Sequence, residues 1–167
     1  AGMTGRRWPR HPLCPPGHQR HHLVPLALLA RPQLATFLTA LAGGEAMLTR
    51  FSCNGLILPA TEKLAMESSL ALHRGPHPAY SDVVAARVDQ IRATSVLTLP
   101  AGLAEARARV RTLQAALRRA LTDRHGQRFW LNRRDPMRVF ADRSYLDDAI
   151  AALYAVAAPS RSDRGDP

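Results

Sequence analysis

Four histidines and one asparagine stand at spacings that could hold a metal ion and activate water. His21 and His22 are adjacent and come directly before an apolar segment, whereas His73 and His77 lie four residues apart near the start of an expected helix. Asn54 lies between these pairs, at the head of an apolar run. Three neutral imidazoles with an open coordination position are typical of a catalytic metal site. A fourth, with an unperturbed pKa of about 6.5, can take a proton from water at neutral pH.

Two short extended segments are expected to position the first three of these residues. Residues 20–26 predict an extended segment closed by Pro25. Neighbouring side chains in such a segment point to opposite faces, so one histidine of the adjacent pair would face a metal and the other the substrate. Asn54 is expected to open a strand that runs to Pro59, because Gly55 and Pro59 bracket three apolar residues.

Helices are expected over most of the remaining chain. Apolar residues at helical spacing predict helices over residues 33–42, 60–72, 78–93, 102–123 and 145–156. Gly43 and Gly44 are expected to end the first of these, and Pro78 suits the first turn of the third. Residues 124–144 are expected to form a basic loop. A solvated face is the first interpretation of the arginines on the 102–123 helix, and contact with DNA is the alternative.

Composition and charge narrow the class of protein. The chain has 167 residues, of which 46% are hydrophobic, and a formal charge of +10 from 23 basic and 13 acidic side chains. This apolar content excludes a disordered polyelectrolyte and indicates one domain with a real core. A basic surface attracts nucleic acid, anionic membrane or acidic protein alike. All basic residues but Lys63 are arginine, which favours bidentate phosphate contacts or reflects a genome biased toward arginine codons.

Several other classes of protein are excluded or left open. No apolar run reaches the roughly 18 residues of a membrane span, and no signal peptide is expected. Cys14 and Cys53 match no CxxC pattern, so a thiolate zinc site is not expected, while a disulfide and two buried thiols both remain possible. The His73-x-x-x-His77 spacing is that of zinc proteases, but the residues between include no glutamate and contain Gly75-Pro76, which would break the helix. A protease is therefore excluded.

Three segments in order resemble a known family. They are Arg20-His21-His22-Leu23-Val24-Pro25, Asn54-Gly55-Leu56-Ile57-Leu58-Pro59 and Leu72-His73-Arg74-Gly75-Pro76-His77-Pro78-Ala79-Tyr80. Together they closely resemble the AHH family of the HNH/endonuclease VII superfamily, over about residues 20–92. Arg20 stands where the family's name motif has alanine. This position precedes both histidines, so the difference puts little of the resemblance in doubt. The resemblance implies an α+β, mostly helical fold: a small ββα-metal nuclease core with added helices.

The resemblance also implies an organisation and a role for each site residue. The expected parts are a Pro/Arg-rich segment (1–19), the nuclease core (20–95), a helical extension (96–158) and a flexible tail (159–167). Motif position implies that His22 is the general base and that Asn54 braces the loop bearing it. Three histidines are implied as ligands of one divalent metal ion: His21, His73 and His77. A loop-holding hydrogen bond is the alternative role for His73. Arg74 is assigned to phosphate binding on chemical grounds alone, and Tyr80 to helix packing. His11, His18 and His125 are expected to lie in solvent, with His18 as the first candidate for an exception because it is three residues from His21.

The implied function is a metal-dependent, sequence-nonspecific DNA endonuclease. Members of the family are often toxin domains of bacteria, so the resemblance implies a secreted or translocated effector, of type VI or contact-dependent delivery, that acts in the cytoplasm of a target cell and has a cognate immunity protein. The metal would be Zn, Ni, Mn or Mg. We expect no membrane partner and no nucleotide cofactor. The alternatives are a non-catalytic nucleic-acid-binding module and a zinc-structured interaction module.

Overall fold

The computed structural model describes residues 13–41, 44–122, 131–132, 134–135 and 150–151. Several sequence predictions fall on other residues and lie outside this part of the chain. They are most of the Pro/Arg-rich segment, His11 and His125, nearly all of the 124–144 loop and of the 145–156 helix, and the tail.

Two antiparallel strands and a helix form the centre of the fold. Strand β1 (His18–His22) pairs with β2 (Gly55–Pro59), and His22 stands opposite Gly55 in the register. Helix α5 (Pro78–Ala93) follows β2 in the chain after one short helix. The expected α+β, mostly helical class with a small ββα core is therefore correct. Strand β1 ends at His22, before the end of the expected extended segment 20–26. It ends there because the chain enters a 3-10 helix, η1 (Leu26–Ala30), after Pro25.

The segment between the strands is helical almost throughout. After η1 come α1 (Pro32–Ala40), α2 (Gly44–Thr49) and α3 (Phe51–Asn54). Gly44 therefore begins a helix, although the sequence predicted that it would end one. The chain leaves α1 at Leu41, whose extended backbone places its side chain fully inside the core.

Asn54 is the last residue of α3, so the prediction that it opens the strand is wrong. The helix spans only about one turn, and the apolar periodicity that marks longer helices cannot be seen over so few residues. Gly55 then starts β2 with an extended backbone, at φ −113° and ψ 151°.

Helix α4 (Glu62–Ser68) is shorter than the expected 60–72 helix. Thr61 caps its first turn by accepting a hydrogen bond from the Leu64 amide at 3.4 Å. Ser69 ends it in the left-handed conformation, at φ 56°. The residues after Ser69 therefore leave the helix and carry His73 toward the strands.

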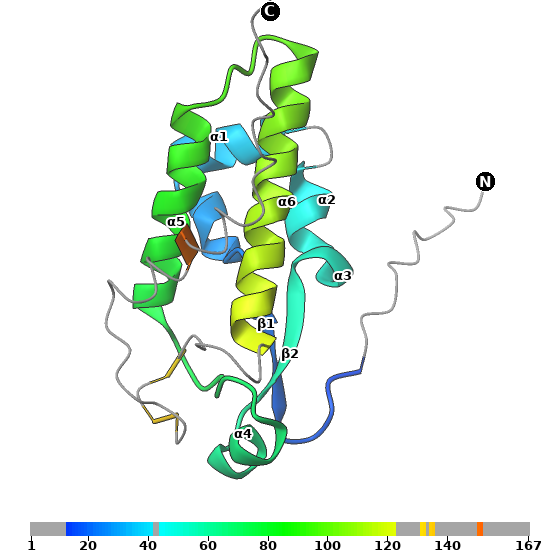
Figure 1. Ribbon diagram of the computed structural model, residues 1–167, viewed down its shortest axis with the longest axis vertical. Coiled ribbons are helices and arrows are strands. Elements are labelled where there is room, and N and C mark those ends of the chain that lie inside the picture. The colour runs from blue at the N-terminus through cyan, green and yellow to red at the C-terminus, as the bar shows by residue number, and fades with distance from the viewer. Residues whose placement is uncertain (1–12, 42–43, 123–130, 133, 136–149, 152–167) are drawn as a thin grey trace, which may run out of the picture.

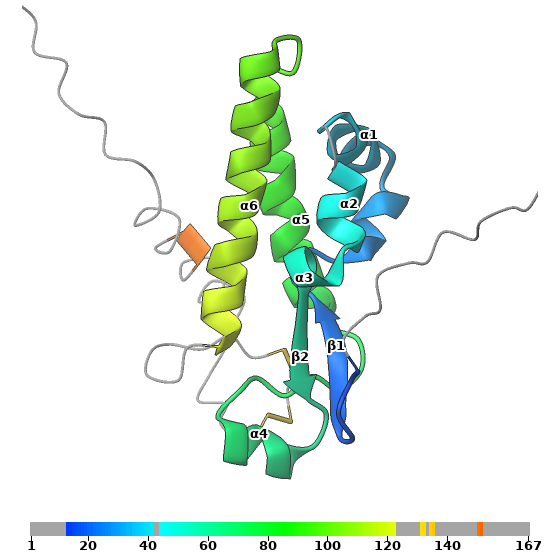
Figure 2. The same ribbon diagram turned by 90° about the vertical axis from the view of Figure 1, so that its right-hand side faces the viewer.

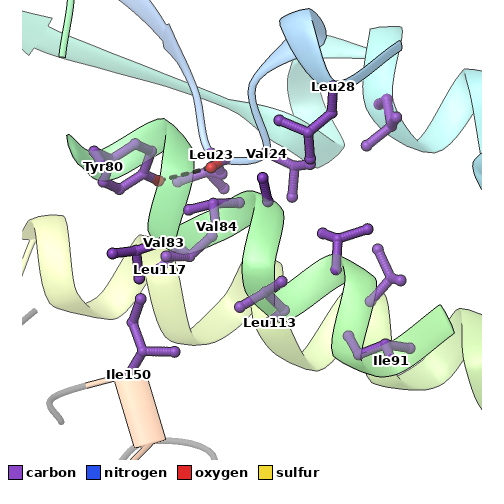
Figure 3. Packing of buried hydrophobic residues seen from close by; sticks show 14 of the residues in the cluster. Leu23, Val24, Leu28, Tyr80, Val83, Val84, Ile91, Leu113, Leu117 and Ile150 are labelled. Atoms are coloured by element: carbon purple, nitrogen blue, oxygen red, sulfur yellow. Dashed lines mark hydrogen bonds between the residues drawn. The ribbon is translucent and has the colours of Figure 1, made fainter. Parts of the chain in front are cut away.

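Helices α5 and α6 (Pro100–Thr122) run antiparallel side by side (Figures 1 and 2), and the two strands lie beside the end of this pair that is opposite its connecting turn. Both helices agree with the predicted ranges within two residues. Their facing apolar side chains pack with the segment after β1 and with Ile150 into one core (Figure 3). Within the described part of the chain, no helix has the length and apolar character needed to span a membrane.

Candidate active site

Three histidines from distant parts of the chain meet beside the strands. His21 lies on β1 with 2% of its surface exposed, His73 lies on the loop after α4, and His77 is the N-cap residue of α5. Ring centroids are 5.0 Å apart for His21 and each of the other two, and 4.9 Å apart for His73 and His77. One ring nitrogen from each lies within 4.8 Å of the others. The structure thus brings together the three histidines that the sequence proposed as ligands.

The local backbone explains how His73 and His77 reach the same place. The His73 amide donates to the Pro59 carbonyl at 2.8 Å, which ties the loop to the end of β2. Gly75 turns the loop at φ +77°, a conformation that side chains other than glycine disfavour. Pro78 occupies the first turn of α5, and the His77 side chain makes no capping bond to the helix. Its ring instead stacks on the Tyr80 ring, with centroids 5.5 Å apart, and its Nε2 faces Nδ1 of His21.

Burial keeps these imidazoles neutral. Desolvation lowers the pKa of His21 to about 2, with further lowering by repulsion from His73, His77 and His22. Desolvation also lowers the pKa of His73 to about 4, with repulsion from His77 as the next cause. The pKa of His77 is lowered by burial as well. All three therefore keep an unprotonated nitrogen at neutral pH, as metal ligation requires.

The donor set fits a divalent ion. Nε2 of His77 lies 3.0 Å from Nδ1 of His21, close to the separation of about 3.3 Å between two nitrogens on one tetrahedral zinc ion. Nε2 of His21 is buried and has no hydrogen-bond partner. Nδ1 of His73 lies 3.0 Å from Oε1 of Gln19, the kind of second contact that orients a ligating imidazole.

The same three histidines would leave an open coordination position on a bound ion. Among the described residues, no further His, Cys, Asp or Glu joins this group of three. Three protein ligands leave a coordination position for water or substrate, which distinguishes catalytic from closed structural zinc sites. Imidazole ligands suit Zn²⁺, Ni²⁺ or Mn²⁺ better than Mg²⁺, which prefers oxygen.

His22 is half-buried and lies next to this group without belonging to it. Its ring meets the Phe51 ring edge-on, with centroids 6.1 Å apart. Phe51 lies over Gly55, the strand partner of His22: a Cβ at Gly55 would stand 2.2 Å from a Phe51 ring carbon. Glycine at this position therefore makes room for the ring against which His22 packs. The Arg20 guanidinium lies over the same ring, 5.6 Å from its centroid.

Asn54 holds the segment that follows His22. The side chain is fully buried, and its Nδ2 donates to the Val24 carbonyl at 2.8 Å and to the Leu48 carbonyl at 2.9 Å. Its Oδ1 accepts from the Val24 amide at 2.8 Å and from Nε2 of Gln114 at 3.1 Å. Every hydrogen-bonding capacity of the amide is used, so the chain just after His22 has one defined path.

Comparison with protein families shows to which family the chain belongs. Residues 3–117 match the model of AHH, described as a nuclease family of the HNH/ENDO VII superfamily with conserved AHH. The chain belongs to the AHH family. Searches of curated proteins and of solved structures gave no match. The family match reaches further than the 20–92 resemblance and takes in α6 as far as Leu117. As an AHH nuclease, the chain acts on nucleic acid with a divalent metal.

The sequence prediction for this AHH nuclease missed two site residues, although a pattern in the sequence could have indicated each of them. Gln19 precedes His21 by two positions on a strand, so both side chains belong to one face. Gln114 interrupts the apolar face of α6, and a buried polar residue needs a partner, here Asn54 and the Met47 carbonyl at 3.2 Å.

Two further residues that support the site could not have been predicted from any pattern in the sequence. The buried Asp135 carboxylate accepts from the Leu72 amide at 2.6 Å, one residue before His73. Asn132 donates through Nδ2 to the Arg74 carbonyl. Asn132 and Asp135 thus hold the His73 loop of the AHH domain although both lie beyond the family match.

The remaining predicted residues are placed as follows. Arg74 is exposed on the loop between two of the grouped histidines. Tyr80 packs in the core, as predicted, and its hydroxyl donates to the Leu23 carbonyl at 2.6 Å (Figure 3). His18 was assigned to solvent but is half-buried, and its Nδ1 lies 3.0 Å from the Pro16 carbonyl oxygen. Cys14 and Cys53 are free thiols, the first half-buried and the second exposed, so neither the disulfide nor the pair of buried thiols is found.

Proposed function

We propose that the chain is a DNA endonuclease in which His22 activates water and His21, His73 and His77 hold one divalent ion. The observation that carries the proposal is the position of His22. It adjoins the buried His21 in the chain, contributes to the lowered pKa of that residue, and remains half-buried outside the group of three. A base needs this combination of nearness to the metal and access to water.

The proposed reaction is hydrolysis of a phosphodiester. An imidazole nitrogen of His22 takes a proton from water as the water oxygen forms a bond to phosphorus, and the bond from phosphorus to the leaving 3′ oxygen breaks. When bound, a divalent ion supplies positive charge to the phosphate oxygens and to the leaving oxygen.

The other residues position these groups. Asn54 keeps the backbone after His22 on one path, so that the imidazole need not be ordered when substrate binds. Gln19 orients the His73 ring from the same face of β1 that carries His21. Arg74, exposed beside the group, is proposed to contact a phosphate oxygen, a role that a guanidinium fork suits.

We further propose that the enzyme is an antibacterial toxin, delivered into the cytoplasm of a rival cell and neutralised by a cognate immunity protein. The support is the family membership together with the charge of +10, which favours sequence-independent contact with the DNA backbone. An acidic immunity protein would suit such a surface.

Plasmid cleavage tests the enzyme assignment. The wild-type protein, supplied in turn with Mn²⁺, Ni²⁺, Zn²⁺ and Mg²⁺, is expected to nick and linearise plasmid DNA with at least one ion. His22→Ala should lower the rate by about 10²–10⁴-fold. His18→Ala, a histidine on the same strand but outside the group, is the matched control. Absence of cleavage with every ion would leave the non-catalytic module as the better function, and full activity of His22→Ala would remove His22 as the base.

Expression in a bacterial cytosol tests the toxin role separately. The wild-type chain should arrest growth and induce the DNA-damage response, and His22→Ala should do neither at the same protein level. Normal growth with active wild-type enzyme present would contradict the toxin role but leave the nuclease assignment intact.

A further inference from the structure

An arginine-lined groove lies outside the group of three histidines, none of which lines it. Its volume is about 840 Å³, and it opens between α6 and the segment formed by α2 and α3. Five arginines line it: Arg50, Arg107, Arg111, Arg118 and Arg119. None of the described residues that line it is acidic or aromatic.

We infer that this groove, which we call the arginine groove, binds the phosphate backbone of the DNA substrate beyond the cleaved bond. This inference rests on the proposed nuclease function and extends it from the reacting phosphate to its neighbours. It replaces the first interpretation of the α6 arginines, a solvated face, by the alternative of DNA contact.

The charges in the groove are not neutralised within the described residues. No ion pair joins any of the five arginines to a described carboxylate. Nε of Arg107 is buried and has no hydrogen-bond partner. Guanidinium groups gathered without counter-charges favour a polyanion, and their fork geometry matches phosphate oxygens.

The groove is connected to His22 by two short chains of contacts. Phe51 touches the His22 ring, and its chain neighbours Arg50 and Ser52 both line the groove. From the other wall, Arg118 donates through Nη2 to the Gly55 carbonyl at 3.0 Å, and Gly55 is the strand partner of His22. A strand of DNA whose reacting phosphate lies at His22 can therefore continue into the groove.

The spacing of the arginines along α6 suits contact with successive phosphates of one DNA strand. Residues 107, 111 and 118 share one face of the helix, and 11 residues of helix rise about 16 Å. One strand of B-DNA presents about five phosphates over that length, since each step rises about 3.4 Å. An acidic protein is the competing occupant, but the centre of a protein interface is enriched in aromatic anchors, which this groove lacks.

Binding of a fluorescein-labelled 20-base-pair DNA duplex to the 167-residue chain tests the inference, measured by anisotropy in EDTA so that no cleavage is needed. The test variant is Arg50→Gln/Arg111→Gln/Arg119→Gln, because these three side chains are exposed, whereas Arg118 has a structural bond. The control variant Arg31→Gln/Arg87→Gln/Arg92→Gln loses the same charge from surfaces outside the groove. Thermal denaturation verifies that both variants are folded.

The groove variant should bind at least about tenfold more weakly at 100 mM salt, and the slope of log Kd against log salt should fall by about 3, one for each lost phosphate contact. The control variant should retain most of the wild-type slope. Equal slopes for the two variants would overturn the inference and leave the groove to an acidic protein partner. Because binding in EDTA needs no catalysis, that result would be separate from any failure of His22 as the base.

Discussion

The side chain of Asn54 pairs with the backbone of Val24 in both directions, accepting from its amide and donating to its carbonyl, each at 2.8 Å. The Asn54 carbonyl also accepts from the Leu23 amide at 2.8 Å. These bonds continue the pairing of β1 and β2 past the last residue pair, His22 and Gly55. The chain on the C-terminal side of the proposed base is thus held by a side chain that imitates a neighbouring strand.

Replacement of Asn54 by alanine should therefore lower the free energy of unfolding of the protein. The change leaves the Val24 amide and two backbone carbonyls buried without their partner, at a cost of about 2–4 kcal/mol in the free energy of unfolding. Urea denaturation followed by circular dichroism measures this loss. Ser52→Ala, at an exposed position of α3, is the matched control. An Asn54→Ala variant as stable as that control would show that the bonds do not support the fold.

Metal binding should depend on each of the three grouped histidines. Isothermal titration with Zn²⁺ should give one ion per chain for the wild type, and His77→Ala should bind at least about 100-fold more weakly because a ligand nitrogen is lost. Saturating Zn²⁺ should also raise the melting temperature of the wild type, since ligand at 100 times Kd adds about 2.7 kcal/mol to stability. His18→Ala should behave as the wild type, and an equal zinc affinity for His77→Ala would exclude it as a ligand.

Acid should destabilise the metal-free protein over a defined range. The pKa values of His21 and His73 are lowered to about 2 and about 4, below the value of about 6.5 for an unfolded histidine. The unfolded chain then binds more protons than the folded one, so stability is complete above pH 6.5 or so and falls as the pH drops toward these folded values.

Melting temperatures measured in EDTA from pH 7.5 to pH 4 should show this fall. His73→Gln keeps a polar side chain but cannot titrate, and it should make the fall shallower. A wild-type melting temperature that stays level between pH 6.5 and pH 4.5 would contradict the neutral, buried state of these rings.

Asp135 should support the site from beyond the family match. Its carboxylate accepts from the Leu72 amide at 2.6 Å, next to His73, and Asp135→Ala leaves that buried amide without this acceptor. We expect a loss of about 1–3 kcal/mol in stability, together with weaker zinc binding because the His73 loop is less well held. Arg134→Ala, at an exposed neighbouring position, is the control. Zinc affinity equal to that of the control would limit Asp135 to the stability of the fold.

The sequence by itself predicted the family, the fold class, the long helices α5 and α6 and the three histidines that the structure brings together. Three histidine and asparagine motifs in order sufficed for the family, and repeated apolar residues at helical spacing marked the helices. It misplaced Asn54 at a strand start and missed α2 and α3, because elements of one or two turns are too short to show a period and depend on their neighbours for stability.

Only the tertiary structure decided how those residues work together. The loop from His73 to His77 meets β1 because Gly75 turns it and the Pro59 carbonyl anchors it, contacts that no local pattern encodes. The lowered pKa values arise from burial, which is a property of the packed core and not of any segment. The arginine groove likewise exists only where α6 faces α2 and α3, because packing brings Arg50 beside four arginines that lie more than 50 residues away in the sequence.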